Sequence, residues 1–201
     1  MSKMSKKKVI GITGSMGSGK SEISRYLRKK YPVLDCDQVN ADLLKKGNLG
    51  YQKLNDLHIV ELDSNGEIIK ESLASYMFSN VEHRKQVEAI LHPLIFDEMH
   101  KWIHEQESLI VFVEMPILFE ISAQEHFDSI WCVVADLDVA LSRLQTYRNF
   151  TREQAFARLV SQMNPEEKMA KSDIVLRNNS TVEQLHMQIE DALKEEKLNG
   201  D

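Results

Sequence analysis

Residues 14–21 have the sequence Gly14-Ser15-Met16-Gly17-Ser18-Gly19-Lys20-Ser21, which fits the pattern G-x-x-x-x-G-K-[ST] of a phosphate-binding loop. Glycines let backbone N–H groups turn toward a phosphate without Cβ clashes. Lys20 of such a loop reaches the β- and γ-phosphates of a nucleotide, and the Ser21 hydroxyl coordinates Mg²⁺. The predicted ATP-binding residues are Gly14, Met16, Gly17, Ser18, Gly19, Lys20, Ser21 and Glu22.

The segments on either side of this loop supply the setting that the pattern requires. Lys8–Ile12 is a short apolar stretch that predicts a buried strand, and a helix is predicted from about Lys20 to Lys30. A helix that begins there directs its positive N-terminal end at the bound phosphate. Glu22 suits the first turn, where the macrodipole favours acidic side chains. The alternative, a Gly- and Ser-rich turn before an ordinary helix, is disfavoured by this strand–loop–helix context.

Farther along the chain, short apolar strands alternate with helical segments. The predicted strands are Val33–Asp35, Ser108–Val113, Ile130–Val134 and Asp173–Leu176. Helices are predicted at 38–46, 137–147, about 151–162 and about 180–197, the last two opened by capping boxes at Thr151 and Ser180. This alternation predicts an α/β fold whose parallel sheet carries helices on both faces.

A long helical stretch without strands interrupts this alternation. From Glu71 to about Gln106 the pattern is helical, and Pro93 is expected to open a new helix within it. We therefore predict an inserted helical subdomain at about 59–107 in a single domain of residues 8–200, whose core is 8–58 and 108–200. Residues 1–7 are predicted to be a basic, solvated tail.

The composition excludes several classes of protein. The 201 residues carry a formal net charge of −6 and no dense basic block beyond the N-terminus, which disfavours duplex nucleic acid as a partner. No apolar run is long enough to span a bilayer, so no membrane association is expected. Cys36 and Cys132 form no CxxC pair, which favours the reducing cytoplasm over a disulfide scaffold or zinc site. No motif indicates an oligomeric state.

A phosphate-binding loop occurs in kinases, GTPases and motor ATPases alike. This chain has no N-K-x-D motif for guanine and no second nucleotide-binding module. A small kinase that uses ATP and Mg²⁺ is therefore the favoured class.

Five segments, in this order and spacing, resemble the dephospho-CoA kinase family over about residues 8–185. They are residues 11–21 (GITGSMGSGKS), 33–37 (VLDCD), 91–95 (LHPLI), 116–120 (PILFE) and 172–178 (SDIVLRN). The resemblance implies that the ribose 3′-hydroxyl of dephospho-CoA attacks the γ-phosphate of ATP to give CoA and ADP. It also implies a five-stranded parallel core, a helical CoA-binding subdomain, and a lid at about 143–165.

Asp37 matches the family residue that acts on the acceptor hydroxyl. It follows the second predicted strand, at the carboxyl end of the sheet where open α/β folds bind ligands. A carboxylate there could accept the hydroxyl proton or orient the oxygen for in-line attack. The alternative is that Asp37 caps the helix predicted to begin at Gln38, since Asp is a favoured N-cap.

Three further side chains are weaker candidates. Asp35 and Glu114 could approach Mg²⁺ through water, although Glu114 could equally be a plain strand-end carboxylate. The resemblance places His92 near the CoA subdomain, whereas a lone His is more often structural.

The predicted lid departs from the family pattern Arg-Leu-x-x-Arg. Here Tyr147 occupies the second arginine's position and Arg148 follows one residue later, about 100° farther around a helix. Arg143, Arg148 and Arg158 are therefore the candidates for clamping the transferred phosphoryl group, and each could instead be a solvated surface arginine.

Two other functions remain open at this point. One is a different small kinase of the phosphate-loop class, acting on a nucleoside monophosphate or a small alcohol. The other is a nucleotide-binding regulator that has lost catalysis, for which an acceptor-facing Asp37 would have no purpose.

Overall fold

The computed structural model describes residues 7–198, so most of the predicted tail at 1–7 lies outside the described residues. The chain forms two compact units. The α/β unit comprises Met1–Leu34 and Gln106–Asp201, and the helical unit comprises Asp35–Glu105. Within residues 7–198, no helix is long and apolar enough to cross a membrane.

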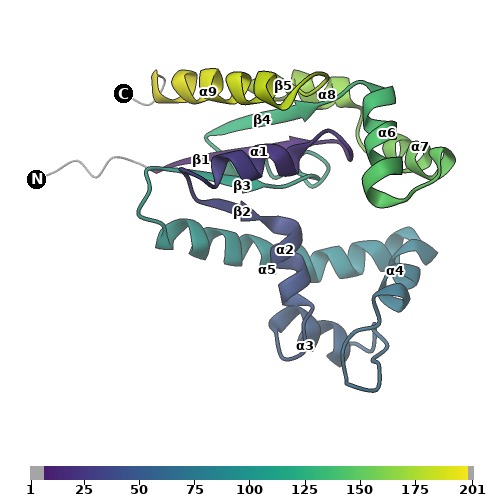
Figure 1. Ribbon diagram of the computed structural model, residues 1–201. Helices are drawn as coiled ribbons and strands as arrows, with labels where there is room; N and C mark the ends of the chain where they lie inside the picture. Colours follow the sequence, from purple (N-terminus) through teal and green to yellow (C-terminus); the bar gives the residue numbers. More distant parts are fainter. Residues whose placement is uncertain (1–6, 199–201) are drawn as a thin grey trace, which may run out of the picture. The chain divides into compact units, whose positions relative to one another are not determined.

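The α/β unit is built on a five-stranded sheet with the order β2-β3-β1-β4-β5 (Figure 1). The strands are β1 (Lys8–Gly14), β2 (Val33–Asp35), β3 (Ile110–Glu114), β4 (Ser129–Val134) and β5 (Ile174–Arg177). Strand β1 is central and pairs in parallel with β3 and β4, and β4 pairs in parallel with β5. The predicted α/β class with a parallel sheet is confirmed.

Helices connect these strands, as a parallel sheet requires. They are α1 (Lys20–Leu27), α6 (Leu137–Arg148), α7 (Arg152–Val160) and α8 (Pro165–Ala170), with a 3₁₀ turn at Gln124–His126. Helix α9 (Val182–Leu198) follows the last strand, β5. The predicted capping box at Thr151 is confirmed, because its hydroxyl accepts from the Gln154 N–H and the Gln154 side chain accepts from the Thr151 N–H. At the start of α9, Thr181 rather than the expected Ser180 accepts the N–H of the residue three positions on, Gln184.

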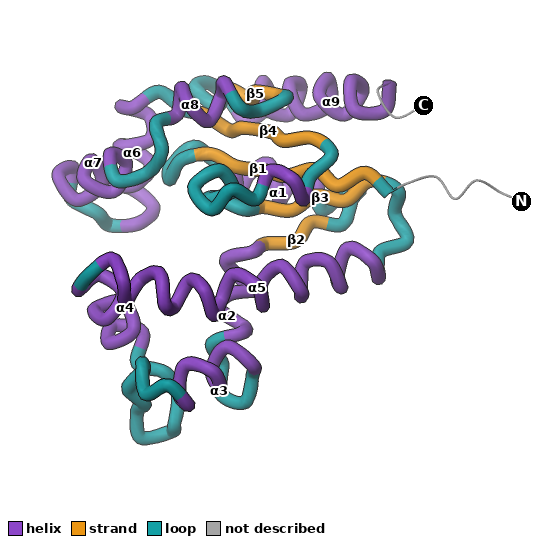
Figure 2. Tube along the Cα trace, turned by 180° about the vertical axis from the view of Figure 1, so that it is seen from behind, coloured by secondary structure: helices purple, strands orange, loops and turns teal. Residues whose placement is uncertain are grey.

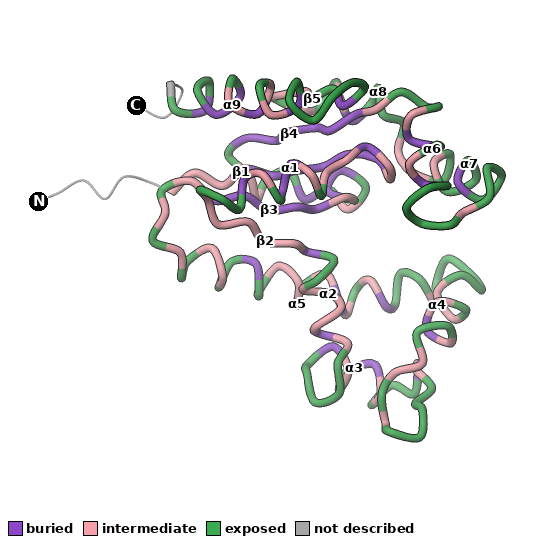
Figure 3. Tube along the Cα trace, in the orientation of Figure 1, coloured by how far each residue is buried: buried purple, intermediate pink, exposed green. Residues whose placement is uncertain are grey.

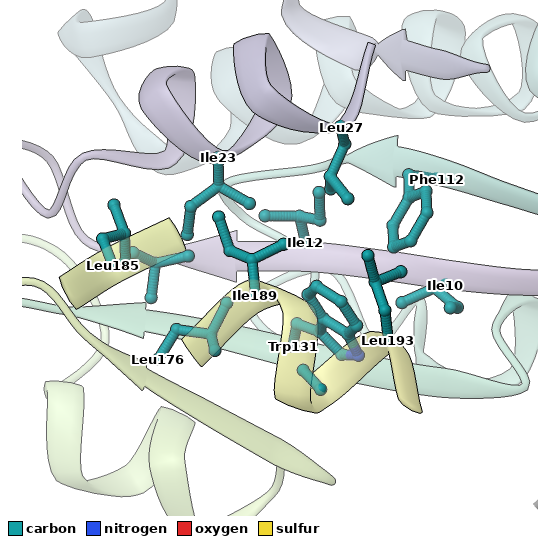
Figure 4. Close-up of a cluster of buried hydrophobic side chains, with 12 residues drawn as sticks. Ile10, Ile12, Ile23, Leu27, Phe112, Trp131, Leu176, Leu185, Ile189 and Leu193 are labelled. Carbon is teal, nitrogen blue, oxygen red and sulfur yellow. The ribbon is translucent and has the colours of Figure 1, made fainter. Parts of the chain in front are cut away.

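One face of the sheet packs against α1 and α9. Figure 4 shows Ile23 of α1 and Ile189 of α9 beside Ile12 and Trp131 of the sheet, all completely buried. Phe112 meets the Trp131 ring edge-on, with 5.2 Å between ring centroids. Buried residues concentrate in β1, β3 and β4 (Figure 3), so the core of the α/β unit is centred on these three strands.

A buried polar cluster joins α9 to the beginning of the sheet. The Glu196 carboxylate accepts hydrogen bonds from Ser129 Oγ and from Trp131 Nε1, the latter at 2.8 Å. It also forms an ion pair with Lys8, at 2.6 Å between Nζ and Oε2. Each polar group thus has a partner, as burial demands.

The helical unit contains α2 (Cys36–Leu43), α3 (Leu49–Asp56), α4 (Lys70–Ser79) and α5 (Val81–Glu105) (Figure 2). It begins at Asp35, whereas the prediction placed its start at about residue 59, because α2 and α3 also pack on α5. Leu54 of α3 shares an apolar cluster with Val87 and Leu91 of α5, and Gly50 lets α3 approach Leu91 closely.

The expectation that Pro93 opens a new helix is wrong. Helix α5 runs through Pro93, and the break falls at Asn80, whose side chain accepts the N–H of His83 at 2.8 Å. A proline inside a helix removes one backbone hydrogen bond, but the apolar contacts of Leu91 and Leu94 on either side keep the helix continuous.

Candidate functional site

The loop of residues 14–21 joins the end of β1 to the start of α1, as the sequence pattern requires. Gly14 has φ +144° and Gly19 has φ +98°, a region that side chains rarely adopt. A Cβ on Gly14 would lie 2.2 Å from the backbone oxygen of Val133, and one on Gly19 would lie 2.0 Å from Nδ2 of Asn178. Both positions therefore require glycine.

The N-terminus of α1 has the features of an anion-binding site. Its N-cap is Gly19, which supplies no side-chain cap, so the helix presents backbone N–H groups and its positive end. The Lys20 ammonium donates to the backbone oxygens of Gly14 at 2.8 Å and Ser15 at 3.0 Å, which places its charge across the loop. Ser21 is exposed in the first turn. The Glu22 carboxylate turns toward Arg25 and His186 on the surface.

Glu114 lies beside the beginning of the loop. It ends β3 opposite Ile12 of β1 and is 8% exposed. Its carboxylate accepts a 2.6 Å hydrogen bond from Ser24 Oγ of α1. A buried carboxylate next to a phosphate loop suits a role in holding Mg²⁺ through water, which stays a prediction.

Arg143 and Asn178 hold the loop from outside. The Arg143 guanidinium donates to the backbone oxygens of Gly17 at 3.3 Å and Ser18 at 3.4 Å. It also donates to the backbone oxygen of Asn178 at 3.0 Å and to Oδ1 at 3.2 Å. Asn178 Nδ2 in turn donates to the Ser18 oxygen at 2.9 Å. The network fixes the carbonyls of Gly17 and Ser18. Because each peptide group is planar, the N–H groups of the residues that follow them are oriented as well.

The other two candidate arginines have different surroundings. Arg148 is the last residue of α6 and is exposed, and Asn149 ends the helix with φ +54°. The Arg158 guanidinium lies 4.5 Å from the centroid of the Phe150 ring, a cation–π geometry. Tyr147, at the family's arginine position, is 78% exposed. Among the three, the structure brings Arg143 to the loop.

Two carboxylates stand at the start of α2 in the helical unit. Asp35, not Asp37, is the N-cap, since its Oδ1 accepts the N–H groups of Asp37 at 2.9 Å and Gln38 at 3.2 Å. The alternative that Asp37 merely caps this helix is therefore wrong. Asp37 is exposed in the first turn of α2, where the helix dipole favours an acidic side chain.

His92 lies on α5 and is half-buried. Burial lowers the pKa of its imidazole, and nearby Glu88 offsets only part of that effect. The imidazole is therefore neutral at physiological pH and could donate or accept one hydrogen bond. Its contact with substrate stays a prediction.

A cavity of about 350 Å³ opens between the loop and α6, α7 and α8, within the α/β unit. Its lining is mostly apolar and consists of Ser15, Met16, Ser18, Val134, Ala135, Leu137, Ala140, Phe156, Leu159, Val160, Gln162, Asn164 and Pro165. Among the described residues, Ser18 Oγ is buried there without a hydrogen-bond partner. The cavity adjoins the predicted nucleotide site.

Two polar residues that the sequence did not single out have structural roles: Asn178 contacts the phosphate loop, and Lys168 is buried nearby in α8. Lys168 of α8 is completely buried, pairs with Glu120 at 2.7 Å and donates to the Pro116 oxygen at 2.9 Å. Thr13 donates to that same oxygen at 3.0 Å. Asn178 and Glu120 both end segments that resemble the family motifs, which is the sequence signal that points to these contacts.

The strand order, together with the loop after the central strand and Lys20 across it, defines a nucleotide-binding fold of the phosphate-loop class. The solved structure of the Thermus thermophilus protein TT1252 shares this fold, with a TM-score of 0.83 and 32% identity, covering 94% of this chain and 98% of that one.

The chain belongs to the dephospho-CoA kinase family, whose model, described as Dephospho-CoA kinase, matches residues 8–184. A dephospho-CoA kinase from Bacillus cereus is 34% identical over 192 residues, which are 92% of this chain and 96% of the relative. The structure of the Campylobacter jejuni dephospho-CoA kinase has a TM-score of 0.68 at 24% identity, covering 94% of this chain and 96% of that one, and it shows the shared fold alone.

Proposed function

We propose that this chain transfers the γ-phosphoryl group of ATP to the ribose 3′-hydroxyl of dephospho-CoA, the last step of coenzyme A biosynthesis. The observation that carries this function is the phosphate loop, in which Gly14, Gly17 and Gly19 stand where a Cβ would clash and Lys20 lies across the opening. Family membership supports dephospho-CoA as the acceptor.

ATP would be held by backbone N–H groups of the loop 14–21, other than the Met16 N–H that donates to Gln162, and by the N-terminal end of α1. Lys20 would exchange its carbonyl contacts for oxygens of the β- and γ-phosphates, since an ammonium binds a phosphate more strongly than a neutral carbonyl. Because charge shifts toward the leaving β-phosphate during transfer, Lys20 stabilises the transition state more than the bound ground state.

The donor set near the loop fits Mg²⁺. Among the described residues no group of three or more His, Cys, Asp or Glu side chains could hold a metal alone. This suits Mg²⁺, which binds through few protein oxygens together with substrate phosphates and water. Ser21 is the direct ligand in this proposal, and Glu114 and Asp35 are candidates for contacts through water. The ion would neutralise charge on the phosphates.

Asp37 is proposed to accept the proton of the attacking hydroxyl or to orient its oxygen. It comes two residues after β2 ends, and Asp35 performs the capping task. A phosphoryl transfer of this kind depends mainly on positioning and electrostatics, so an orienting carboxylate is sufficient even if proton transfer is late.

The remaining roles belong to the same proposal. Arg143 is the first candidate to supply positive charge near the transferred group, with Arg148 and Arg158 as alternatives that would need the lid at about 143–165 to move. His92 and the helical unit would contact the CoA portion of the substrate. The reducing cytoplasm suits Cys36 and Cys132, which are buried and form no disulfide within the described residues.

A direct test measures ADP release from ATP and Mg²⁺ with dephospho-CoA, AMP, pantetheine or adenosine as separate acceptors. We expect turnover with dephospho-CoA alone. Turnover confined to AMP would move the assignment to another small kinase. ATP binding without turnover on any acceptor would favour a nucleotide-binding regulator.

A further inference from the structure

The third residue of the phosphate loop is bonded to a segment far along the chain. The backbone N–H of Met16 donates to Oε1 of Gln162 at 2.9 Å. Gln162 is half-buried and lies in the short connection between α7, which ends at Val160, and α8, which begins at Pro165. The Met16 N–H thus has its acceptor outside the loop.

The Met16 side chain is held by the same part of the chain. It packs against the apolar cluster formed by Leu141 and Leu144 of α6 and Ala155 of α7. Backbone and side chain of Met16 therefore have partners in the segment 137–162. The orientation of the Ser15–Met16 peptide depends on this segment as well as on the loop's own glycines.

The residues that follow Gln162 are held in place by hydrogen bonds and an ion pair. Helix α8 is capped by Asn164, whose Oδ1 accepts the N–H of Glu166 at 2.8 Å. Buried Lys168 fastens α8 to Glu120 and to the Pro116 oxygen, and the Met163 N–H donates to the same Glu120 oxygen at 3.4 Å. A bond from Gln162 can therefore resist rotation of the Ser15–Met16 peptide.

We propose that Gln162 is a positioning residue of the phosphate loop, which it keeps in its phosphate-binding conformation through the Met16 N–H. This inference rests on the proposed nucleotide-binding function of the loop. Without Gln162 as acceptor, the Met16 N–H would need a different hydrogen-bond partner, and the Ser15–Met16 peptide would have to rotate to reach it. That rotation would change the orientation of the neighbouring N–H groups of the loop. Nucleotide affinity should then fall because the loop must be reordered on binding.

The test compares Gln162→Met, which keeps the side-chain length and removes the acceptor, with Gln145→Met on the exposed face of α6 as a matched control. The amide exchange rate and ¹⁵N–¹H shift of Met16 report the bond directly. Calorimetry with ADP reports nucleotide affinity. Neither measurement requires an acceptor substrate. A negative result would therefore contradict the role of Gln162 without bearing on the proposed kinase activity.

In Gln162→Met we expect faster exchange at Met16 and a Kd for ADP raised about tenfold, with unchanged KM for dephospho-CoA. Gln145→Met should match the wild-type protein, and Gln162→Glu, which restores an acceptor, should restore slow exchange at Met16. Unchanged exchange in Gln162→Met, or an ADP Kd within about twofold of wild type, would overturn the proposal. If Gln162→Met does not fold, Gln162→Ser supplies the same comparison.

Discussion

Arg143 grips Asn178 at two points, donating to its backbone oxygen at 3.0 Å and to its side-chain oxygen at 3.2 Å. The planar guanidinium can do this while also reaching the carbonyls of Gly17 and Ser18, because its donors lie in a fixed fork. A lysine at this position would have one nitrogen for the whole network. The relationship links α6, the end of β5 and the phosphate loop.

We therefore expect Arg143→Lys to lower kcat/KM for ATP by roughly 10- to 100-fold, the effect of losing about 1.5–3 kcal/mol of charged hydrogen bonding. Initial rates at varied ATP concentration check this. Arg148→Ala and Arg158→Ala are the comparisons. Wild-type rates in Arg143→Ala, Arg148→Ala and Arg158→Ala alike would remove any arginine from the proposed phosphoryl clamp.

Lys20→Ala should lower kcat by about a hundredfold or more, because a charge near the transition state is lost. The fold should persist, since Lys20 lies at a helix start and its ammonium donates to carbonyls of the loop rather than to the core. Steady-state rates and circular dichroism check the two parts. Lys29 is an exposed lysine two residues after the end of α1, so Lys29→Ala removes the same charge and is the matched control, which should retain activity.

Substitution of Asp37 should affect mainly the catalytic rate, whereas loss of the cap at Asp35 should lower the free energy of unfolding. Asp37→Asn should lower kcat by about a hundredfold with a smaller change in KM, as expected for a group acting on the acceptor hydroxyl. Asp35→Ala should cost about 1 kcal/mol in the free energy of unfolding, while Asp35→Asn keeps a capping oxygen and should cost little. An unchanged kcat in Asp37→Asn would refute its proposed role.

Gly19→Ala tests the close approach of Asn178. The new Cβ would meet Nδ2 of Asn178 at 2.0 Å, so destabilisation of about 1–3 kcal/mol and weaker ATP binding are expected. Gly47→Ala is a matched control, because its φ is +89° and nothing lies within 4 Å of its Cβ position. Chemical denaturation measures the loss in the free energy of unfolding for each variant. Both substitutions introduce backbone strain at a positive φ, so the additional loss in Gly19→Ala reports the clash with Asn178. Equal losses in the two variants would contradict a role for the Gly19–Asn178 contact in holding the loop.

Stability at acid pH should depend on Glu196. Burial raises the pKa of its carboxyl, but hydrogen bonds from Lys8, Ser129 and Trp131 outweigh burial, and the pKa is lowered from its ordinary value of 4.5. Because the folded state binds the proton less readily, this contribution is complete above pH 4.5 and is lost as the pH falls below it. Melting temperatures from about pH 6 to about pH 3 should show a shallower decline in Glu196→Gln than in the wild-type protein.

Much of the fold follows from local patterns in the sequence. The strand before Gly14 and the helix after Lys20 can be predicted because apolar periodicity and the glycine spacing agree. The capping box at Thr151 is equally local. The sequence does not decide which residue caps a helix where two suitable residues lie close together. Asp35 caps α2 although Asp37 is also a suitable N-cap, and Thr181 accepts a capping hydrogen bond where Ser180 is expected.

Contacts between distant segments are beyond such patterns. The bonds from Arg143 to Asn178 and from Met16 to Gln162 join residues 35 and 146 positions apart. No periodicity encodes such a pair. The continuity of α5 through Pro93 also depends on packing, since the local signal favours a helix start there. Family resemblance identifies segments of the site, while their mutual hydrogen bonds depend on how the folded chain brings them together.

Both outer strands of the sheet are short: β2 has three residues and β5 has four. An outer strand exposes unpaired backbone groups, and its length limits how many hydrogen bonds a second molecule could add to it. The protein is thus poorly suited to strand-by-strand self-association. During refolding at high concentration, its apolar helix faces would then be a greater aggregation hazard than its sheet margins.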